Sequence, residues 1–250
     1  MNRLFIRRFS VDTAQIPAGS YLAGLPAVRG GGLTFTAPVT FFVGENGTGK
    51  STLIEALAVA YGLNPEGGSR NFVFSTRDSH SPLWRAVHLE KGAVSPRDAY
   101  FLRAESFYNV ATNIDELDDA PGDSSPLIRS AYGGVSLHEQ SHGESFLALV
   151  RERFSGGGLY ILDEPEAALS PVGQMALLAR IHELAQAGAQ LIIATHSPLL
   201  TACPGAQVYE FRRSGPEAVP YRETAHFQIL QRFYRQPEAV LHELLDEPQR

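Results

Sequence analysis

Residues 39–65, VTFFVGENGTGKSTLIEALAVAYGLNP, decide the fold of this chain. Five consecutive apolar or β-branched residues, 39–43, predict a buried strand, and the glycine-rich segment 44–49 predicts a tight turn after it. A helix is expected next, ending at Gly62, because apolar residues recur there at helical spacing. They are Leu53, Ile54, Leu57, Ala58 and Tyr61. A buried strand that turns directly into a helix is typical of an α/β protein with a parallel sheet.

The same alternation of apolar runs and helical patterns recurs further along the chain. The runs are AYFLR (99–103), LYIL (159–162) and QLIIA (190–194). A helix is expected at about 144–154, and Ser170-Pro171 predicts the start of another, because serine is a good N-cap and proline suits the first helical position. We therefore expect a mostly parallel central sheet flanked by helices.

The remaining segments are expected to belong to one domain, 1–250. Residues 64–143 are expected to form an inserted lobe of loops and helices. Residues 206–250 are expected to form a hairpin, over 206–222, and two short helices broken at Pro237. We expect this tail to pack against the body and cover an edge of the sheet.

The composition is that of an ordinary globular domain. Of 250 residues, 44% are hydrophobic and 19% are charged, and the net charge of -6 argues against a protein that is basic all over and coats nucleic acid. The single cysteine, Cys203, excludes an internal disulfide. No apolar run approaches the roughly 20 residues of a membrane helix, and the first residues lack the apolar core of a signal peptide. We expect a cytoplasmic protein without membrane insertion.

The turn after the first buried strand carries a phosphate-binding pattern. Residues 44–51, GENGTGKS, fit G-x-x-x-x-G-K-[ST], and they lie between a strand and a helix as that motif requires. Backbone N–H groups and the helix N-terminus would face an anion, Lys50 would reach the β- and γ-phosphates, and Ser51 would ligate Mg²⁺. The residues expected to bind the nucleotide here are Gly44, Glu45, Asn46, Gly47, Thr48, Gly49, Lys50, Ser51 and Thr52.

Two further motifs follow buried strands. Asp163 comes at the end of one strand, where a parallel sheet presents ligand-binding groups, and its carboxylate suits Mg²⁺. The adjacent Glu164 can polarise a water for attack on the γ-phosphate. His196, in ATHSP (194–198), follows the next strand and could bond a γ-phosphate oxygen. We therefore predict Lys50, Glu164 and His196 as catalytic residues, with ATP and Mg²⁺ as cofactors.

These motifs, in this order, resemble the ATP-binding-cassette (ABC) ATPase superfamily of P-loop NTPases. The similarity is to stand-alone soluble members, predicted bacterial ATPases of unknown physiological role that are distantly like the ATPase heads of DNA-repair and chromosome-maintenance proteins. It runs over nearly the whole chain and includes FSTRDSHS, FLRAESF and YRETAHFQ. The resemblance implies an antiparallel β portion near the N-terminus and a small helical lobe. It also implies a head-to-tail homodimer in which Ser141 and Gly143 bind the γ-phosphate held by the partner.

The segment HEQSHGES (138–145) has two incompatible interpretations. His138 to His142 fits the zinc-protease pattern H-E-x-x-H, which must lie within one helix to aim both histidines at one metal. Ser141 and Glu144 instead form an S-x-x-E capping box, with backbone amides that could bind a phosphate. Because Gly143 follows at once and the helical pattern begins after it, we favour the capped helix and expect no structural zinc.

The chain departs from the family pattern in several places. Gln140-Ser141-His142-Gly143 replaces the usual Leu-Ser-Gly-Gly, and His142 could make binding in trans sensitive to pH. Glu105 stands where the family has a glutamine that contacts the metal. Tyr21 and Phe35 are both candidates for stacking on adenine, and both could equally be core residues.

Three functional hypotheses result. The main one is a Mg²⁺-dependent ATPase that closes as a homodimer around two ATP molecules. The second is a slow nucleotide-gated switch that captures a protein or DNA partner. The third and weakest is the motor subunit of a membrane transporter.

Overall fold

The computed structural model describes residues 4–69, 81–104 and 142–246. Glu105, Ser141 and most of the expected inserted lobe lie outside the described residues. Within them, no helix combines the length and apolarity needed to cross a bilayer.

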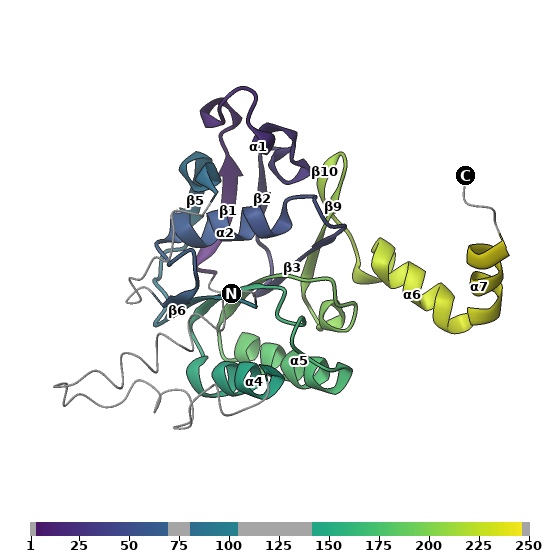
Figure 1. Ribbon diagram of the computed structural model, residues 1–250. Coiled ribbons are helices and arrows are strands. Elements are labelled where there is room, and N and C mark those ends of the chain that lie inside the picture. The colour runs from purple at the N-terminus through teal and green to yellow at the C-terminus, as the bar shows by residue number, and fades with distance from the viewer. Residues whose placement is uncertain (1–3, 70–80, 105–141, 247–250) are drawn as a thin grey trace, which may run out of the picture.

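The centre of the molecule is a mixed, mostly parallel sheet of seven strands (Figure 1). In spatial order these are β10 (Gly215–Ala218), β9 (Gln207–Arg212), β3 (Val39–Gly44), β8 (Gln190–Ala194), β7 (Leu159–Asp163), β6 (Ala99–Arg103) and β4 (Gly68–Ser69). The five central strands, from β9 to β6, pair in parallel, and β10 and β4 are antiparallel at the edges. The predicted fold class is confirmed.

A second, antiparallel sheet covers one side of the molecule. It contains β2 (Gly32–Thr34), β1 (Ile6–Val11) and β5 (Val87–Lys91), in that order. Helix α2 (Lys50–Tyr61) lies between the two sheets in Figure 1, and its apolar residues share one core with both of them. The antiparallel portion near the N-terminus was expected from the family resemblance, although its individual strands were not.

Helices α4 (His142–Arg153) and α5 (Pro171–Gln186) cover the opposite face of the large sheet (Figure 1). Their apolar sides pack with the strands in a second core, in which the rings of Phe154 and Tyr160 stack 4.0 Å apart. Helix α5 begins as predicted, because the side chain of Ser170 accepts a hydrogen bond from the Gly173 N–H and Pro171 follows it. The fold therefore has four layers, which are the small antiparallel sheet, α2, the large sheet, and the pair α4 and α5.

Short helices complete the body. They are α1 (Tyr21–Gly24) and the 3₁₀ turns η1 (Thr13–Gln15), η2 (Pro26–Val28), η3 (Pro82–Ala86), η6 (Leu200–Ala202) and η7 (Tyr221–Glu223). Of these, η2 and η6 matter for the site, since η2 packs against the glycine-rich loop and η6 follows the loop after β8.

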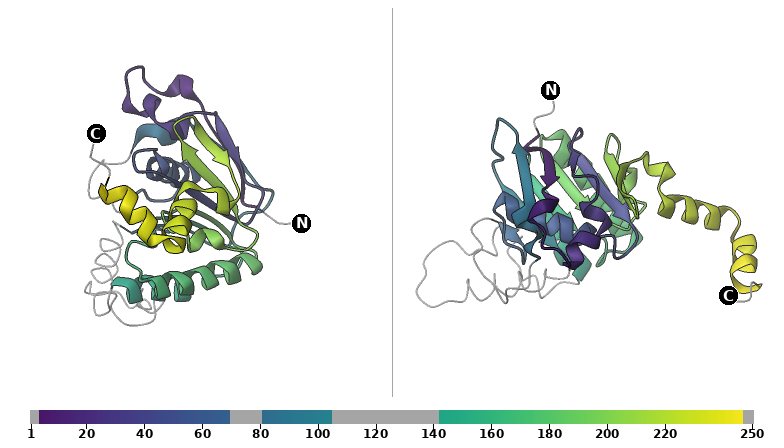
Figure 2. Two further views of the ribbon diagram at one scale, coloured as in Figure 1. Left: turned by 90° about the vertical axis from the view of Figure 1, so that its right-hand side faces the viewer. Right: turned by 90° about the horizontal axis from the view of Figure 1, so that it is seen from above.

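The two C-terminal helices extend away from the body (Figures 1 and 2). The hairpin of β9 and β10 and two helices, α6 (Ala225–Arg235) and α7 (Pro237–Asp246), confirm the predicted elements and the break at Pro237. The expectation that these helices cover a sheet edge is wrong, because they form an arm that projects sideways (Figures 1 and 2). Its root is fixed by Glu210, whose Oε1 accepts the Ala225 N–H at 2.6 Å. The large apolar side chains exposed on the arm are Ile229, Tyr234, Leu241, Leu244 and Leu245.

Candidate nucleotide site

The glycine-rich loop joins β3 to α2 at the carboxyl edge of the parallel strands. Gly44 and Gly49 both have positive φ, 136° and 91°. A Cβ at Gly44 would lie 2.6 Å from the carbonyl oxygen of Phe211, and one at Gly49 would lie 2.9 Å from Cβ of Ala27. Only glycine fits these two positions, so the loop is shaped both by its own conformation and by its packing against β9 and η2.

Lys50, the first residue of α2, lies almost fully buried beneath this loop. Its Nζ donates hydrogen bonds to the carbonyl oxygens of Gly44 at 2.8 Å and Glu45 at 2.9 Å. Burial lowers the pKa of Lys50, and the carboxylates of Glu164, Asp163 and Glu166 oppose that shift. The ammonium group is thus placed at the opening of the loop with three carboxylates near it.

Asp163 and Glu164 stand at the end of β7 in different surroundings. Asp163 is buried between the neighbouring strands β6 and β8. Glu164 has a positive φ of 51°, the only such value at a non-glycine residue in the described ranges, and its N–H donates to the carbonyl of Ala194 at 2.9 Å. A left-handed conformation at a residue with a Cβ costs on the order of 1–3 kcal/mol and persists only where surroundings enforce it. This conformation turns the Glu164 side chain out of the sheet, where 41% of it is exposed.

His196 lies in the loop after β8, beside the end of β7. Its Nε2 is 3.6 Å from Oε1 of Glu164. Its backbone N–H donates to Oε1 of Glu166 at 2.6 Å. The structure therefore brings Glu164 and His196 together at the ends of the paired strands β7 and β8. Glu166 was missed, although the run DEPE does show a third carboxylate in the sequence.

A bridge of polar side chains connects this loop to the start of α5. The Ser197 hydroxyl donates to Oε1 of Gln174 at 2.7 Å, and Nε2 of Gln174 donates to the carbonyl of Leu169 at 3.1 Å. The segment after β7 and the segment after β8 are thereby held in one arrangement. No sequence signal pointed to Gln174, because its partner lies 23 residues away.

A second residue that sequence reasoning missed is Arg103, at the end of β6. Its Nη1 is 2.7 Å from Oε2 of Glu55, and its Nε is 3.4 Å from Oδ2 of Asp163. A cavity of about 280 Å³ opens beside this group. It is lined by Ser51, Arg103, Ala104, Asp163, Glu164, Ala167 and Ala168. Two of the predicted Mg²⁺ ligands, Ser51 and Asp163, thus line the same cavity as the predicted base, Glu164.

The segment HEQSHGES (138–145) lies only partly within the described residues. Helix α4 begins at His142, so Gly143 and Glu144 lie in its first turn. They line neither the cavity beside Ser51 nor a second one, of about 520 Å³, that adjoins the loop between β3 and α2. Gly143 instead touches the segment after β7, since a Cβ there would lie 2.8 Å from the carbonyl oxygen of Ala168. The capping box and the roles of Ser141 and Glu105 stay predictions.

The two aromatic residues considered for stacking on adenine, Phe35 and Tyr21, differ in their exposure to solvent. Phe35 is 3% exposed and packs between the rings of Phe9 and Phe42, at 6.0 and 6.5 Å, so of its two interpretations the core residue is the correct one. Its apolar surface is used in the core. Tyr21 is 65% exposed in α1, shortly before the residues that contact Gly49, and stays a candidate.

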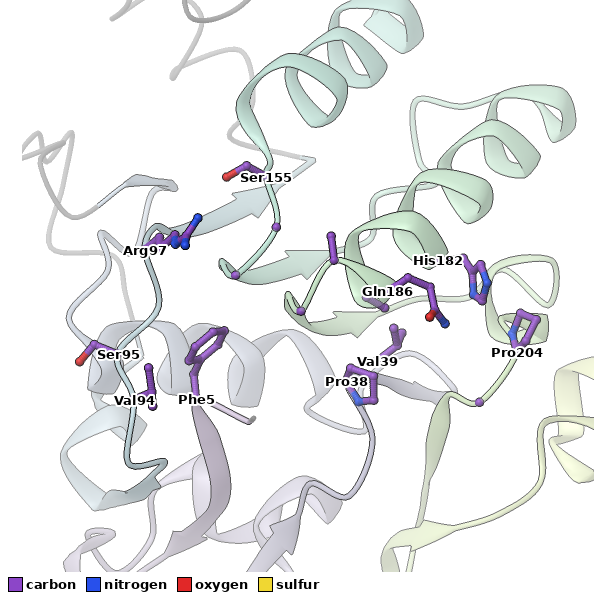
Figure 3. Close-up of a pocket in the computed structure, with 16 residues that line it drawn as sticks. Phe5, Pro38, Val39, Val94, Ser95, Arg97, Ser155, His182, Gln186 and Pro204 are labelled. Atoms are coloured by element: carbon purple, nitrogen blue, oxygen red, sulfur yellow. The ribbon is translucent and has the colours of Figure 1, made fainter. Parts of the chain in front are cut away.

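A larger cavity, of about 820 Å³, lies at the amino ends of the parallel strands (Figure 3). Arg97, Ser155 and His182 border it. It contains none of the residues of the three motifs. Since ligands of parallel sheets bind at the carboxyl ends, the nucleotide site is assigned to the opposite edge.

Comparison with known proteins places the chain in a family of ATPases. Residues 88–202 match a family described as "AAA domain, putative AbiEii toxin, Type IV TA system", and residues 22–97 match a family described as "AAA domain". The chain is 30% identical over 191 residues to the cytochrome c biogenesis ATP-binding export protein CcmA of Rhodopseudomonas palustris (strain HaA2), covering 70% of this chain and 90% of that protein.

Two solved structures are examples of proteins with a similar fold. One is CbiO1 of Clostridium perfringens, part of the ABC transporter complex CbiONQ, which is 19% identical to this chain. The match covers 98% of this chain and 100% of that chain, with a TM-score of 0.49. The other is the SMC head domain of Thermotoga maritima, with 14% identity, 87% and 99% covered, and a TM-score of 0.44.

The chain belongs to the P-loop ATPases of the AAA/ABC type. It is an ATP-binding ATPase.

Proposed function

We propose that this ATPase is Mg²⁺-dependent and works as a homodimer with two ATP molecules held between its protomers. The observation that carries the proposal is the convergence of Lys50, Asp163, Glu164 and His196 at one edge of the sheet, from three different strand ends. A cation that can bind phosphates, Lys50, thus lies close to two carboxylates that can serve a metal ion and a water, Asp163 and Glu164. The proposal assigns phosphate binding to the loop 44–49, Lys50, Ser51 and Thr52.

The donors beside Ser51 suit Mg²⁺. The Ser51 hydroxyl and the Asp163 carboxylate line one cavity, and both are the hard oxygen ligands that this ion prefers. Glu105 is a further proposed ligand on the family resemblance alone. A bound Mg²⁺ would neutralise charge on the phosphate oxygens.

Glu164 is the proposed general base, and His196 is proposed to contact the γ-phosphate. The exposed carboxylate of Glu164 can accept a proton from an attacking water, and His196 lies within 3.6 Å of it. Lys50 would leave the carbonyls of Gly44 and Glu45 for the β- and γ-phosphates, where a cation stabilises developing charge.

The location of Gly143 and Glu144 supports completion of the site in trans. They open α4 at a helix N-terminus, where N–H groups favour an anion, yet they line neither cavity next to their own loop 44–49. In a head-to-tail dimer, this helix start and Ser141 would face the γ-phosphate of the partner subunit.

Light scattering of Glu164→Gln tests the dimer. This variant should bind ATP without hydrolysing it, so the mass should double when Mg²⁺ and ATP are added. Adding Ser141→Arg should abolish the doubling, whereas the distant Arg97→Gln should not. If ATP binds and the mass stays that of one chain, the homodimer is wrong.

A second candidate function, a nucleotide-gated switch, is favoured by the arm of α6 and α7. Its exposed apolar side chains are of the kind that bind protein partners. Under this proposal ATP turnover by the isolated chain is slow and rises when a protein or DNA partner is present. Turnover that is already fast, and that removal of the arm leaves unchanged, would count against it.

The transporter hypothesis is supported only by the name of the export protein to which the chain is similar. We propose it as the weakest alternative. It requires a stable complex with membrane permease chains, which affinity purification in detergent would detect. Recovery of the chain alone would exclude such a complex under those conditions.

A further inference from the structure

Arg103 forms ion pairs with Glu55 and with Asp163. Arg103 and Asp163 also line the cavity beside Ser51. Arg103 is one quarter exposed, whereas the carboxylates on either side of it are buried, at 8% and 4% exposure. The guanidinium is therefore a cation inside the site, at the end of the strand adjacent to the one that carries Asp163 and Glu164.

Glu55 holds this cation from the side of α2. Its Oε2 accepts from Nη1 of Arg103 at 2.7 Å, and its Oε1 accepts from the Ser81 N–H at 2.9 Å. Both carboxylate oxygens are thus engaged, which fixes their direction. A charge-assisted bond of this kind orients a guanidinium strongly, because its donors lie in a rigid plane.

The contact between Arg103 and Asp163 is looser, at 3.4 Å. If Asp163 serves Mg²⁺, as proposed above, its negative charge is shared with the metal. The guanidinium remains attached to Glu55, and it still lines the cavity that Ser51 and Glu164 border. A positive group there suits the additional negative charge that the third phosphate brings.

We propose that Arg103 binds the γ-phosphate of ATP and that Glu55 is its positioning residue. This inference rests on the proposed function, because it takes the cavity beside Ser51 as the γ-phosphate and metal site. It supplies a cation from the same chain, in addition to Lys50, that distinguishes ATP from ADP. In other phosphoryl-transfer enzymes, an arginine supplied in cis stabilises the charge on the transferred phosphoryl group.

Calorimetric titration with ATP and ADP tests the assignment, using Mg²⁺ and the full chain in the Glu164→Gln background. Arg103→Gln should raise the Kd for ATP about tenfold, which corresponds to about 1.4 kcal/mol. The Kd for ADP should change less than about twofold, because ADP lacks the third phosphate. Arg103→Lys should recover only part of the loss, since an ammonium group cannot keep the planar bond to Glu55 while contacting phosphate.

Arg153→Gln is the matched control. Arg153 forms a partly buried ion pair with Asp98 at 2.6 Å, so its loss removes a comparable interaction away from the cavity. This control should leave both affinities unchanged. Glu55→Gln should raise the Kd for ATP about threefold and leave the Kd for ADP unchanged. It provides the same comparison if Arg103→Gln does not fold.

The results distinguish an error in the assignment of the nucleotide site from an error in the role of Arg103. If Lys50→Ala binds both nucleotides like the parent, the nucleotide site itself is wrongly assigned. If Lys50→Ala loses binding while Arg103→Gln affects ATP and ADP equally, or affects neither, the nucleotide site stands and the role of Arg103 is wrong.

Discussion

The backbone N–H of His196 donates a hydrogen bond to the carboxylate of Glu166 at 2.6 Å. The loop after β8 is thereby fixed to the loop after β7, and His196 is held with its ring beside Glu164. The position of the histidine depends on an acidic residue that has no direct role in the proposed reaction.

Glu166→Ala should therefore slow turnover without preventing nucleotide binding. A hydrogen bond to a charged group is worth about 1.5–3 kcal/mol, so we expect kcat to fall about tenfold or more while the Kd for ATP changes less than about twofold. Steady-state kinetics and calorimetry would measure the two quantities. Glu152→Ala, which breaks an exposed pair with Arg151, is the control and should leave both unchanged. An equal loss in binding would show that Glu166 shapes the whole site.

Lys50→Ala should remove ATP binding. The ammonium group would contact two phosphates, and losing two charge-assisted bonds corresponds to at least about a hundredfold in Kd. Titration calorimetry gives the affinity directly. Lys91→Ala, a surface lysine over the ring of Tyr61, serves as the control. Unchanged ATPase activity in Lys50→Ala would refute the assignment of the loop.

Gly143→Ala should destabilise the folded chain as well as impair any function in trans. The new Cβ would lie 2.8 Å from a backbone oxygen of Ala168, and overpacking of this kind costs about 1–3 kcal/mol. Thermal unfolding should show a lower midpoint for this variant. Gly24→Ala, where nothing lies within 4 Å of the added carbon, should not lower it. If Gly143→Ala unfolds like the parent, the close approach is relieved without cost.

Cys203 should contribute to a loss of stability in alkaline solution. Burial raises the pKa of its thiol to about 11, from its ordinary value of 9.0. Because the folded-state pKa is the higher one, the contribution is fully present below about pH 9 and disappears as the pH rises toward about 11. Denaturant unfolding between these limits should therefore show a shallower decline with pH in Cys203→Ala than in the parent. Parallel declines would mean that the thiol titrates alike in both states.

The sequence was sufficient for the parts of the fold that local patterns determine. Apolar runs located β3, β6, β7 and β8 almost to the residue, because a strand buried on both faces is continuously apolar. Ser170-Pro171 located the start of α5 for an equally local reason.

Contacts between distant residues could not be predicted in the same way. Arg103 meets Asp163 only because β6 and β7 pair in a register that places them side by side. Nothing in either segment alone encodes that register. The direction of the arm was also missed. An amphipathic pattern predicts that one face of a helix is apolar, but it does not identify which element or partner packs against that face.

The projecting arm also affects how molecular mass can be measured. A 27.2 kDa chain with two helices extending from its body has a larger Stokes radius than a sphere of the same mass. It should leave a gel-filtration column early, at a volume that a globular standard would assign to a heavier particle. Elution volume therefore overstates the number of chains, and counting them requires scattering or sedimentation equilibrium, whose results do not depend on shape.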